Sequence, residues 1–202
     1  MLCKMLACTT VARKQSAIPL EKGHADGMDI SLPRSIFRSV ADRFSMRRCT
    51  AHYCFTEVCQ AIQSSLHPRL VCWPATREKW QENADAFERQ YGIQGCVGCV
   101  DGSHVPVKPP AHDRDSYINR KGFPSVNLMA VCDHFQRFIH TYAERAGSVH
   151  DARVFRVSDI GRRALDNELF NCDEFNLLGD SAYPLLPQVQ NKHFVIIHRL
   201  SL

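Results

Sequence analysis

One segment of the 202-residue sequence constrains the fold more than any other, the run IQGCVGCVDGSHVPV at residues 93–107. It is rich in valine and glycine, and Asp101 is its first charged residue. A strand that lacks charges along most of its length is typical of the centre of a sheet that is covered on both faces. We therefore expect a buried central strand that carries an acidic side chain toward its end.

The segments after this strand alternate between β-like and helical patterns. Residues 126–133 and 137–147 are two β-like runs separated by a short polar connection, which predicts an antiparallel hairpin. Apolar residues at helical spacing follow over residues 150–160, and FNLLGD at residues 175–180 reads as a short strand that ends in Asp180. Strands and helices in this order predict an α/β domain.

The sequence before the central strand divides into two parts. Residues 1–30 carry scattered charge without a clear period, so we expect a flexible leader there. Residues 31–92 have the apolar spacing of helices and are expected to form a small helical segment. Residues 93–202 then contain the α/β domain.

Three helices are expected in the helical segment. The first begins near Leu32 after a Ser31 cap, the second is capped by Thr50, and the third is capped by Thr76 and runs toward Tyr91. The turn between the first two helices permits a helix-turn-helix reader of DNA, although ordinary helix packing is the commoner explanation of such a pair. The second helix offers few basic side chains to a DNA groove, so both interpretations stay open.

The composition excludes several classes of protein. Hydrophobic residues at 45% and charged residues at 23% are typical of a globular chain. No apolar run approaches the length of about 18 residues that spans a membrane, and the first residues lack a convincing signal core. The ten cysteines are therefore expected to be reduced thiols. A formal net charge of +4 permits a polyanionic partner without demonstrating one.

Three acids stand at breaks in the apolar pattern beside glycine or histidine: Asp101, Asp151 and Asp180. A carboxylate at the end of a buried strand needs a cation, a cage of hydrogen bonds or solvent. Mg²⁺ and Mn²⁺ prefer carboxylate oxygens, and two such ions can activate water for phosphodiester cleavage. For each acid taken alone, turn or capping chemistry is the competing explanation. Asp133, which precedes the hairpin turn, is assigned to turn chemistry.

Cys96 and Cys99 form a Cys-x-x-Cys pair, a spacing that often raises proposals of zinc or redox chemistry. Both lie in the apolar run, where strict alternation places residues three apart on opposite faces of a strand. We therefore predict that these two cysteines are core residues on opposite faces, rather than a zinc site.

Four segments occur in a characteristic order: VDGSH at 100–104, YINRKGFPSVNLMAVCDHFQRF at 117–138, AGSVHDARVF at 146–155 and LLGDSAYP at 177–184. Together they resemble the ordered motifs of the Harbinger (PIF)-type, transposase-derived DDE nuclease family. The resemblance implies an RNase H-like fold, in which a mixed sheet is flanked by helices. The helical segment before it is similar to the helix-turn-helix-like part that precedes this nuclease.

The same resemblance implies a site and a reaction. Asp101, Asp151 and Asp180 match acidic positions that bind a divalent cation, Mg²⁺ or Mn²⁺, and catalyse the hydrolysis of DNA phosphodiester bonds. Arg120 and Lys121 match a basic segment, which makes them candidates for contact with DNA phosphate, with a solvated loop as the alternative. DNA as partner, a separate DNA-binding subunit and a location in the nucleus follow as expectations.

The sequence departs from the family pattern after Asp180, which is its last acidic residue. The family continues to a glutamate on a helix, and this glutamate completes the acidic set. Two hypotheses follow. In the first, the chain is a metal-dependent endonuclease domain, and its activity needs a direct test because the final glutamate is absent. In the second, it is a non-catalytic remnant that binds DNA or another protein.

Overall fold

A computed structural model describes residues 34–191 of the chain, so the expected leader and the Ser31 cap lie outside the described residues. The chain divides into two compact units. Within the described range, the first unit comprises residues 34–69, 104–126 and 146–148, and the second comprises residues 70–103, 127–145 and 149–191. All three candidate acids belong to the second unit.

The first unit contains the helices α2 (Arg34–Arg43) and α3 (Arg48–Ala61), a π-helical turn, η1 (Ile62–Leu66), and all but the last residue of α4 (His67–Leu70). The cap expected at Thr50 is wrong. The helix begins at Arg48, so its N-cap residue is Arg47, three residues before Thr50, and Arg47 makes no side-chain capping bond. Thr50 is therefore already inside the first turn, where its hydroxyl is not at the capping position.

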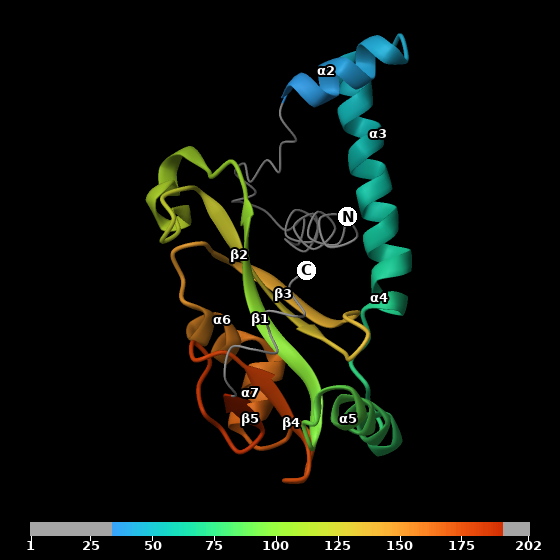
Figure 1. Ribbon diagram of the computed structural model, residues 1–202. Helices are drawn as coiled ribbons and strands as arrows, with labels where there is room; N and C mark the ends of the chain where they lie inside the picture. Colours follow the sequence, from blue (N-terminus) through green and yellow to red (C-terminus); the bar gives the residue numbers. More distant parts are fainter. Residues whose placement is uncertain (1–33, 192–202) are drawn as a thin grey trace. The chain divides into compact units, whose positions relative to one another are not determined.

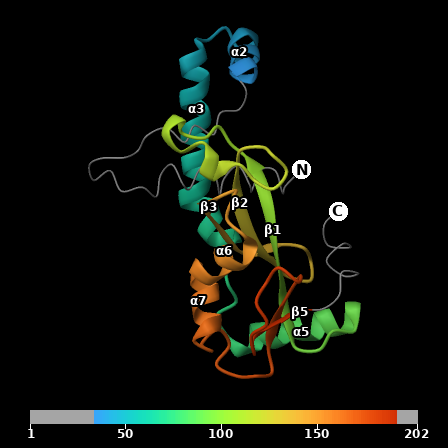
Figure 2. The ribbon, with the colours of Figure 1, turned by 90° about the vertical axis from the view of Figure 1, so that its left-hand side faces the viewer.

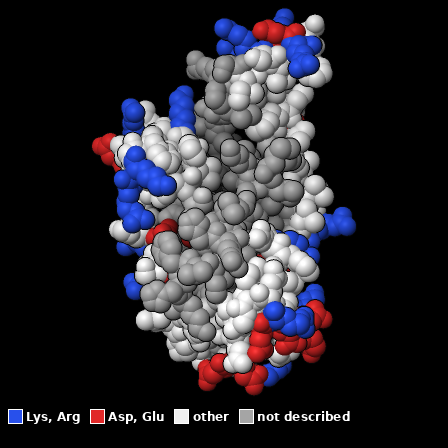
Figure 3. Space-filling view, viewed as in Figure 1, with Lys and Arg blue, Asp and Glu red and all other residues white. Residues whose placement is uncertain are grey.

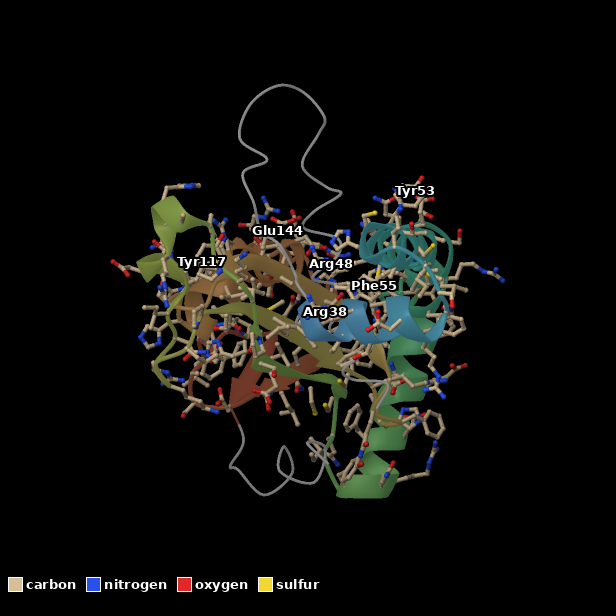
Figure 4. The ribbon with its side chains drawn as sticks, turned by 90° about the horizontal axis from the view of Figure 1, so that it is seen from above. Arg38, Arg48, Tyr53, Phe55, Tyr117 and Glu144 are labelled. Carbon is tan, nitrogen blue, oxygen red and sulfur yellow. The ribbon has the colours of Figure 1, made fainter. Side chains whose placement is uncertain are left out.

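α2 and α3 pack through a small apolar contact. Phe37 and Ala41 on α2 and Ala51 on α3 are buried, and the ring centroids of Phe37 and Phe55 lie 5.7 Å apart in an edge-on arrangement. Figure 4 shows Phe55 on the side of α3 toward α2, whereas Tyr53, which is 65% exposed, points away. Packing thus explains the helix pair, and DNA reading by it stays a prediction.

The chain forms a mixed five-stranded sheet with the order β3-β2-β1-β4-β5. β1 pairs in parallel with β4, and β4 pairs in parallel with β5. The strands are β1 (Cys96–Pro106), β2 (Ser125–Cys132), β3 (Phe138–Ala146), β4 (Asn176–Gly179) and β5 (Val189–Asn191). The predicted α/β class, a mixed sheet flanked by helices, is confirmed, and the run at 93–107 indeed supplies the central strand.

The turn between β2 and β3 is organised by Asp133, as its assignment to turn chemistry predicted. Its Oδ1 accepts hydrogen bonds from the backbone N–H groups of Phe135 and Arg137, both at 2.9 Å. Its Oδ2 accepts a hydrogen bond from the Arg137 guanidinium at 2.8 Å. The carboxylate is buried but fully partnered, which explains why a charge is tolerated there.

Helix α5 (Arg77–Tyr91) begins and ends where the sequence predicts. The Thr76 side chain accepts a hydrogen bond from the Lys79 N–H, and Gly92 ends the helix in the left-handed conformation at φ +69°. Trp80 on this helix is buried in the core of the second unit. The third helix of the helical segment therefore packs with the core of the second unit.

Helices α6 (Asp151–Val157) and α7 (Asp159–Leu165) lie beside each other on one face of the sheet (Figures 1 and 2). The sequence predicted one helical stretch, and Ser158 divides it. The Ser158 hydroxyl donates to the Phe155 carbonyl at 2.7 Å and accepts from the Gly161 N–H at 3.0 Å. A β-carbon on Gly161 would lie 1.8 Å from the same carbonyl oxygen, so this corner requires glycine.

The sheet separates two apolar clusters. The cluster on the α6 side includes Val97 and Val100, whereas Cys96 and Cys99 pack on the other side with Phe87. The prediction that the two cysteines face opposite sides is therefore wrong. The register of β1 against β4 shifts between Cys96 and Gly98, and such a bulge inserts one residue and resets the alternation. Their expected role as core residues is confirmed by their burial.

Candidate metal and nuclease site

Asp101 and Asp180 stand at matching positions on neighbouring strands. The parallel register pairs Cys99 of β1 with Leu178 of β4. Continued by two residues, this register aligns Asp101 with Asp180, which follows the last residue of β4. Adjacent strands are about 4.8 Å apart, so two side chains on the same face at aligned positions are close neighbours.

The alternation of β1 shows which face Asp101 occupies. Val100 packs in the cluster on the α6 side, and a β-carbon on Gly102 would point to Asp151 at the start of α6. Since successive side chains of a strand point to opposite faces, Asp101 points to the face of Cys99.

The same argument places Asp180. Leu177 packs on the α6 side, Leu178 packs with Cys99 on the other side, and a β-carbon on Gly179 would meet the Tyr183 ring of the α6-side cluster at 3.0 Å. Asp180 therefore shares a face with Asp101. Asp151 belongs to the opposite face.

Each of the paired carboxylates has one oxygen held by the backbone. Oδ1 of Asp101 accepts a hydrogen bond from the Gly102 N–H at 2.8 Å, and Oδ1 of Asp180 accepts one from the Ala182 N–H at 2.9 Å. Within residues 34–191, no hydrogen bond or ion pair reaches the other oxygen, Oδ2, of either side chain. Both carboxylates are thus oriented, and each keeps one oxygen open to a ligand.

The charges of the site act on one another. Asp101 is exposed by surface area, yet the protein atoms around the strand end remove part of its hydration, and this burial raises the pKa of its carboxyl. The Gly102 N–H lowers that pKa, and the negative charges of Asp180 and then Asp151 raise it further. In the part of the chain that the structure describes, no three His, Cys, Asp or Glu side chains are grouped as ligands of one metal ion.

The pKa of Asp101 gives a direct test of this arrangement. In EDTA, the Asp101 carboxyl should titrate above the ordinary range of an aspartate, and Asp180→Asn should lower its pKa because a neighbouring negative charge is removed. A raised folded-state pKa contributes stability that is complete below the unfolded pKa and is lost as pH rises through the folded pKa. Carboxyl NMR shifts across a pH series measure the midpoint. An unchanged Asp101 midpoint in Asp180→Asn would contradict the pairing.

Asp151 is the first residue of α6, as predicted, but it does not cap the helix. The N-cap residue is His150, whose side chain makes no capping bond. Oδ1 of Asp151 instead accepts a hydrogen bond from the Asn127 side-chain amide at 2.7 Å. Sequence reasoning missed Asn127. The signal was a polar residue inside the apolar strand VNLMAV, where an unpartnered amide is costly.

Tyr183, part of the segment LLGDSAYP, lies near the three acids, and sequence reasoning assigned it no role. Its ring is buried and packs edge-on against Phe155 of α6 at a centroid distance of 5.7 Å. Burial raises the pKa of the Tyr183 phenol far above its usual value, and the charges of Asp151, Asp101 and Asp180, in that order, raise it further. The hydroxyl is therefore a neutral group that can donate a hydrogen bond near the carboxylates.

The candidate phosphate contacts Arg120 and Lys121 lie in the first unit, on an exposed turn. Asn119 builds this turn. Its buried side chain accepts hydrogen bonds from the Lys121 and Phe123 N–H groups, and Gly122 takes φ +78°. Basic side chains gather over this loop region in Figure 3, where the exposed ones are Lys108, Arg114, Arg120 and Lys121. The turn is well defined and presents its charges to solvent, so both phosphate binding and simple solvation fit it.

Comparison with known proteins identifies relatives of the chain. Residues 100–197, which include all three candidate acids, match the family described as DDE superfamily endonuclease. The chain is 33% identical over 139 residues to the Bos taurus protein named "Putative nuclease HARBI1", an alignment that covers 69% of this chain and 37% of that protein. It is 26% identical over 164 residues to the Arabidopsis thaliana "Protein ALP1-like", covering 73% of this chain and 38% of that protein.

The chain thus spans well under half the length of these curated relatives. No solved structure is significantly similar to it. None of the helices within residues 34–191 is long and apolar enough to cross a membrane.

Proposed function

Because the chain belongs to the DDE superfamily endonucleases of the Harbinger transposase-derived type, we propose that it hydrolyses DNA phosphodiester bonds with a divalent cation held by Asp101 and Asp180. One observation carries the proposal. Two carboxylates stand at aligned positions on neighbouring parallel strands, on one face, each with one oxygen fixed by a backbone N–H. The negative charge of Asp180 disfavours the charged form of Asp101, and a bound cation would relieve this repulsion.

The donor set fits a hard cation. Carboxylate oxygens are the ligands that Mg²⁺ and Mn²⁺ prefer, and within the described residues no Lys or Arg neutralises either side chain. When bound, such an ion supplies activation of water and stabilisation of the leaving oxygen. The protein's own contribution is orientation, since the Gly102 and Ala182 N–H groups fix one oxygen of each carboxylate.

The further elements of the proposal concern substrate and location. Arg120 and Lys121 are exposed cations on a turn that is hydrogen-bonded to Asn119, which supports a role in binding DNA phosphate. A nuclear location and a separate DNA-binding subunit are part of the proposal because chromosomal DNA is the expected substrate.

Asp151 was expected to be a third metal ligand. Its place on the other face favours a different role, which its own variants can test.

A nicking assay tests the activity. The purified chain with Mn²⁺ should convert supercoiled plasmid to the open-circular form, and either Asp101→Ala or Asp180→Ala should lower the rate by about a hundredfold or more, because each removes half of the carboxylate pair. Agarose electrophoresis over time measures the rate. Asp173→Ala, which removes an exposed acid outside the site, is the matched control and should keep the wild-type rate.

The outcomes separate the two hypotheses about the chain. Mn²⁺-dependent nicking that both site variants lose supports the nuclease. If the wild type, both site variants and the control show one common background, catalysis by this chain is refuted and a non-catalytic binding role remains.

A further inference from the structure

Asp151 lies directly behind the backbone that carries Asp101. A β-carbon placed on Gly102 would be 2.5 Å from Oδ1 of Asp151 and 2.9 Å from its Cγ. The carboxylate therefore occupies the space where any other residue at position 102 would put its side chain. It contacts β1 from the α6 side, whereas Asp101 points to the other face.

Asn127 holds this carboxylate in place. The residue is 1% exposed, and its amide nitrogen donates to Oδ1 of Asp151 at 2.7 Å and to the Val149 carbonyl at 3.0 Å. One amide thus ties the middle of the sheet to the start of α6. Its Oδ1 is buried and accepts no hydrogen bond within the described residues. The side chain is therefore oriented so that its NH₂ group is hydrogen-bonded, although its carbonyl oxygen is not.

The contact continues through Gly102 to the metal-binding face. Asp151 fills the position where a β-carbon of Gly102 would stand, and the backbone N–H of the same residue donates to Oδ1 of Asp101. A shift of Asp151 would therefore free this part of β1 to move, and with it the hydrogen bond that orients Asp101. Groups that orient the ligands of a metal are the ones whose loss weakens metal binding without removing a ligand.

We propose that Asp151, clamped by Asn127 behind Gly102, is a positioning residue for Asp101 and not a ligand of the metal. This role rests on the proposed metal site of Asp101 and Asp180. It assigns a function to Asn127, which the family motifs quoted above leave without one, and it explains why the third acid stands on the wrong face to complete the pair.

Titration of Mn²⁺ followed by electron paramagnetic resonance separates a positioning residue from a ligand. Asp151→Asn keeps the shape and the oxygen that accepts from Asn127, so it should retain Mn²⁺ affinity within about tenfold of wild type. Asn127→Leu and Asp151→Ala each remove the clamp and should weaken affinity by about 10–100-fold. The double variant should be no weaker than the weaker single variant, because both changes break one contact. Asp101→Asn should abolish the binding.

Asn176→Leu is the matched control. Asn176 is also a buried asparagine of the sheet whose Oδ1 lacks a hydrogen-bond partner among the described residues, but it begins β4, four residues before Asp180. It should bind Mn²⁺ as wild type does. Melting of each variant in EDTA shows that the titrations are made on folded protein.

Each remaining outcome decides the matter. If Asp151→Asn abolishes Mn²⁺ binding as Asp101→Asn does, Asp151 is a ligand and the positioning role is overturned. If Asn127→Leu and Asp151→Ala bind as tightly as Asn176→Leu, the clamp has no effect on the site and the role is again overturned. If the wild-type chain itself binds no Mn²⁺, the proposed metal site fails first, and the inference falls with it.

Discussion

At a Mn²⁺ concentration of about one hundred times its Kd, the wild-type chain should melt about 5–11 °C higher than in EDTA. Binding to the folded state at that ratio stabilises it by about 2.7 kcal/mol, and a chain of this size gains about 2–4 °C for each kcal/mol. Mn²⁺ is suited to the measurement because it favours carboxylate oxygens over the thiols that unfolding exposes. Differential scanning calorimetry measures the shift.

Asp101→Asn and Asp180→Asn should abolish the rise in melting temperature that Mn²⁺ causes. The more stable protein should then depend on the metal, the variants in EDTA and the wild type in Mn²⁺. In EDTA near pH 7, each variant should melt at or above the wild-type temperature, because the repulsion within the carboxylate pair is relieved. With Mn²⁺, the wild type should overtake both. A wild-type shift that persists in both variants would show that the metal binds elsewhere, and wild-type melting above both variants in EDTA would contradict the repulsion.

Gly161→Ala should cause the largest loss of stability of any single added methyl group in the second unit. The new β-carbon would lie 1.8 Å from the Phe155 carbonyl oxygen, and both belong to the backbone of the α6–α7 corner, so neither can yield by rotating a side chain. Overpacking of this kind costs about 3 kcal/mol, which corresponds to a fall in Tm of about 6–12 °C. Circular dichroism melting in EDTA measures it.

Gly92→Ala is the control for the loss of glycine itself. Gly92 has φ +69°, but no atom lies within 4 Å of a β-carbon added there. Alanine at this position would therefore have backbone strain but no steric clash. Its cost of about 1 kcal/mol should lower Tm by only about 2–4 °C. If the two variants melt at the same temperature, the corner is not as tightly closed as the distances indicate.

Local chemistry made several elements predictable from the sequence. Thr76 and Gly92 mark the ends of α5 because capping and the left-handed conformation depend on only a few residues. The hairpin of β2 and β3 and its organiser Asp133 followed from a short polar break between two β-like runs. The strand that ends in Asp180 was predicted from a run of apolar residues and a following acid.

Features that depend on tertiary contacts could not be predicted in this way. The cap expected at Thr50 is a local feature and was still wrong, since α3 follows the N-cap residue Arg47, which makes no side-chain capping bond. The faces of Cys96 and Cys99 were wrong because a bulge leaves no local signature in a glycine-rich run. The role of Asn127 depends on α6, whose approach to the sheet no residue of the strand encodes by itself.

The bulge near Cys96 has a consequence for how this site can change in evolution. A pleated strand gives each position a parity, odd or even, and the extra residue sets the parity of everything after it, including Asp101. The face on which Asp101 lies therefore depends on the number of residues in the strand before it, as well as on the identity of the side chain. A chain that kept every acid but lost one residue from this bulge would place the Asp101 side chain on the opposite face of the sheet from Asp180.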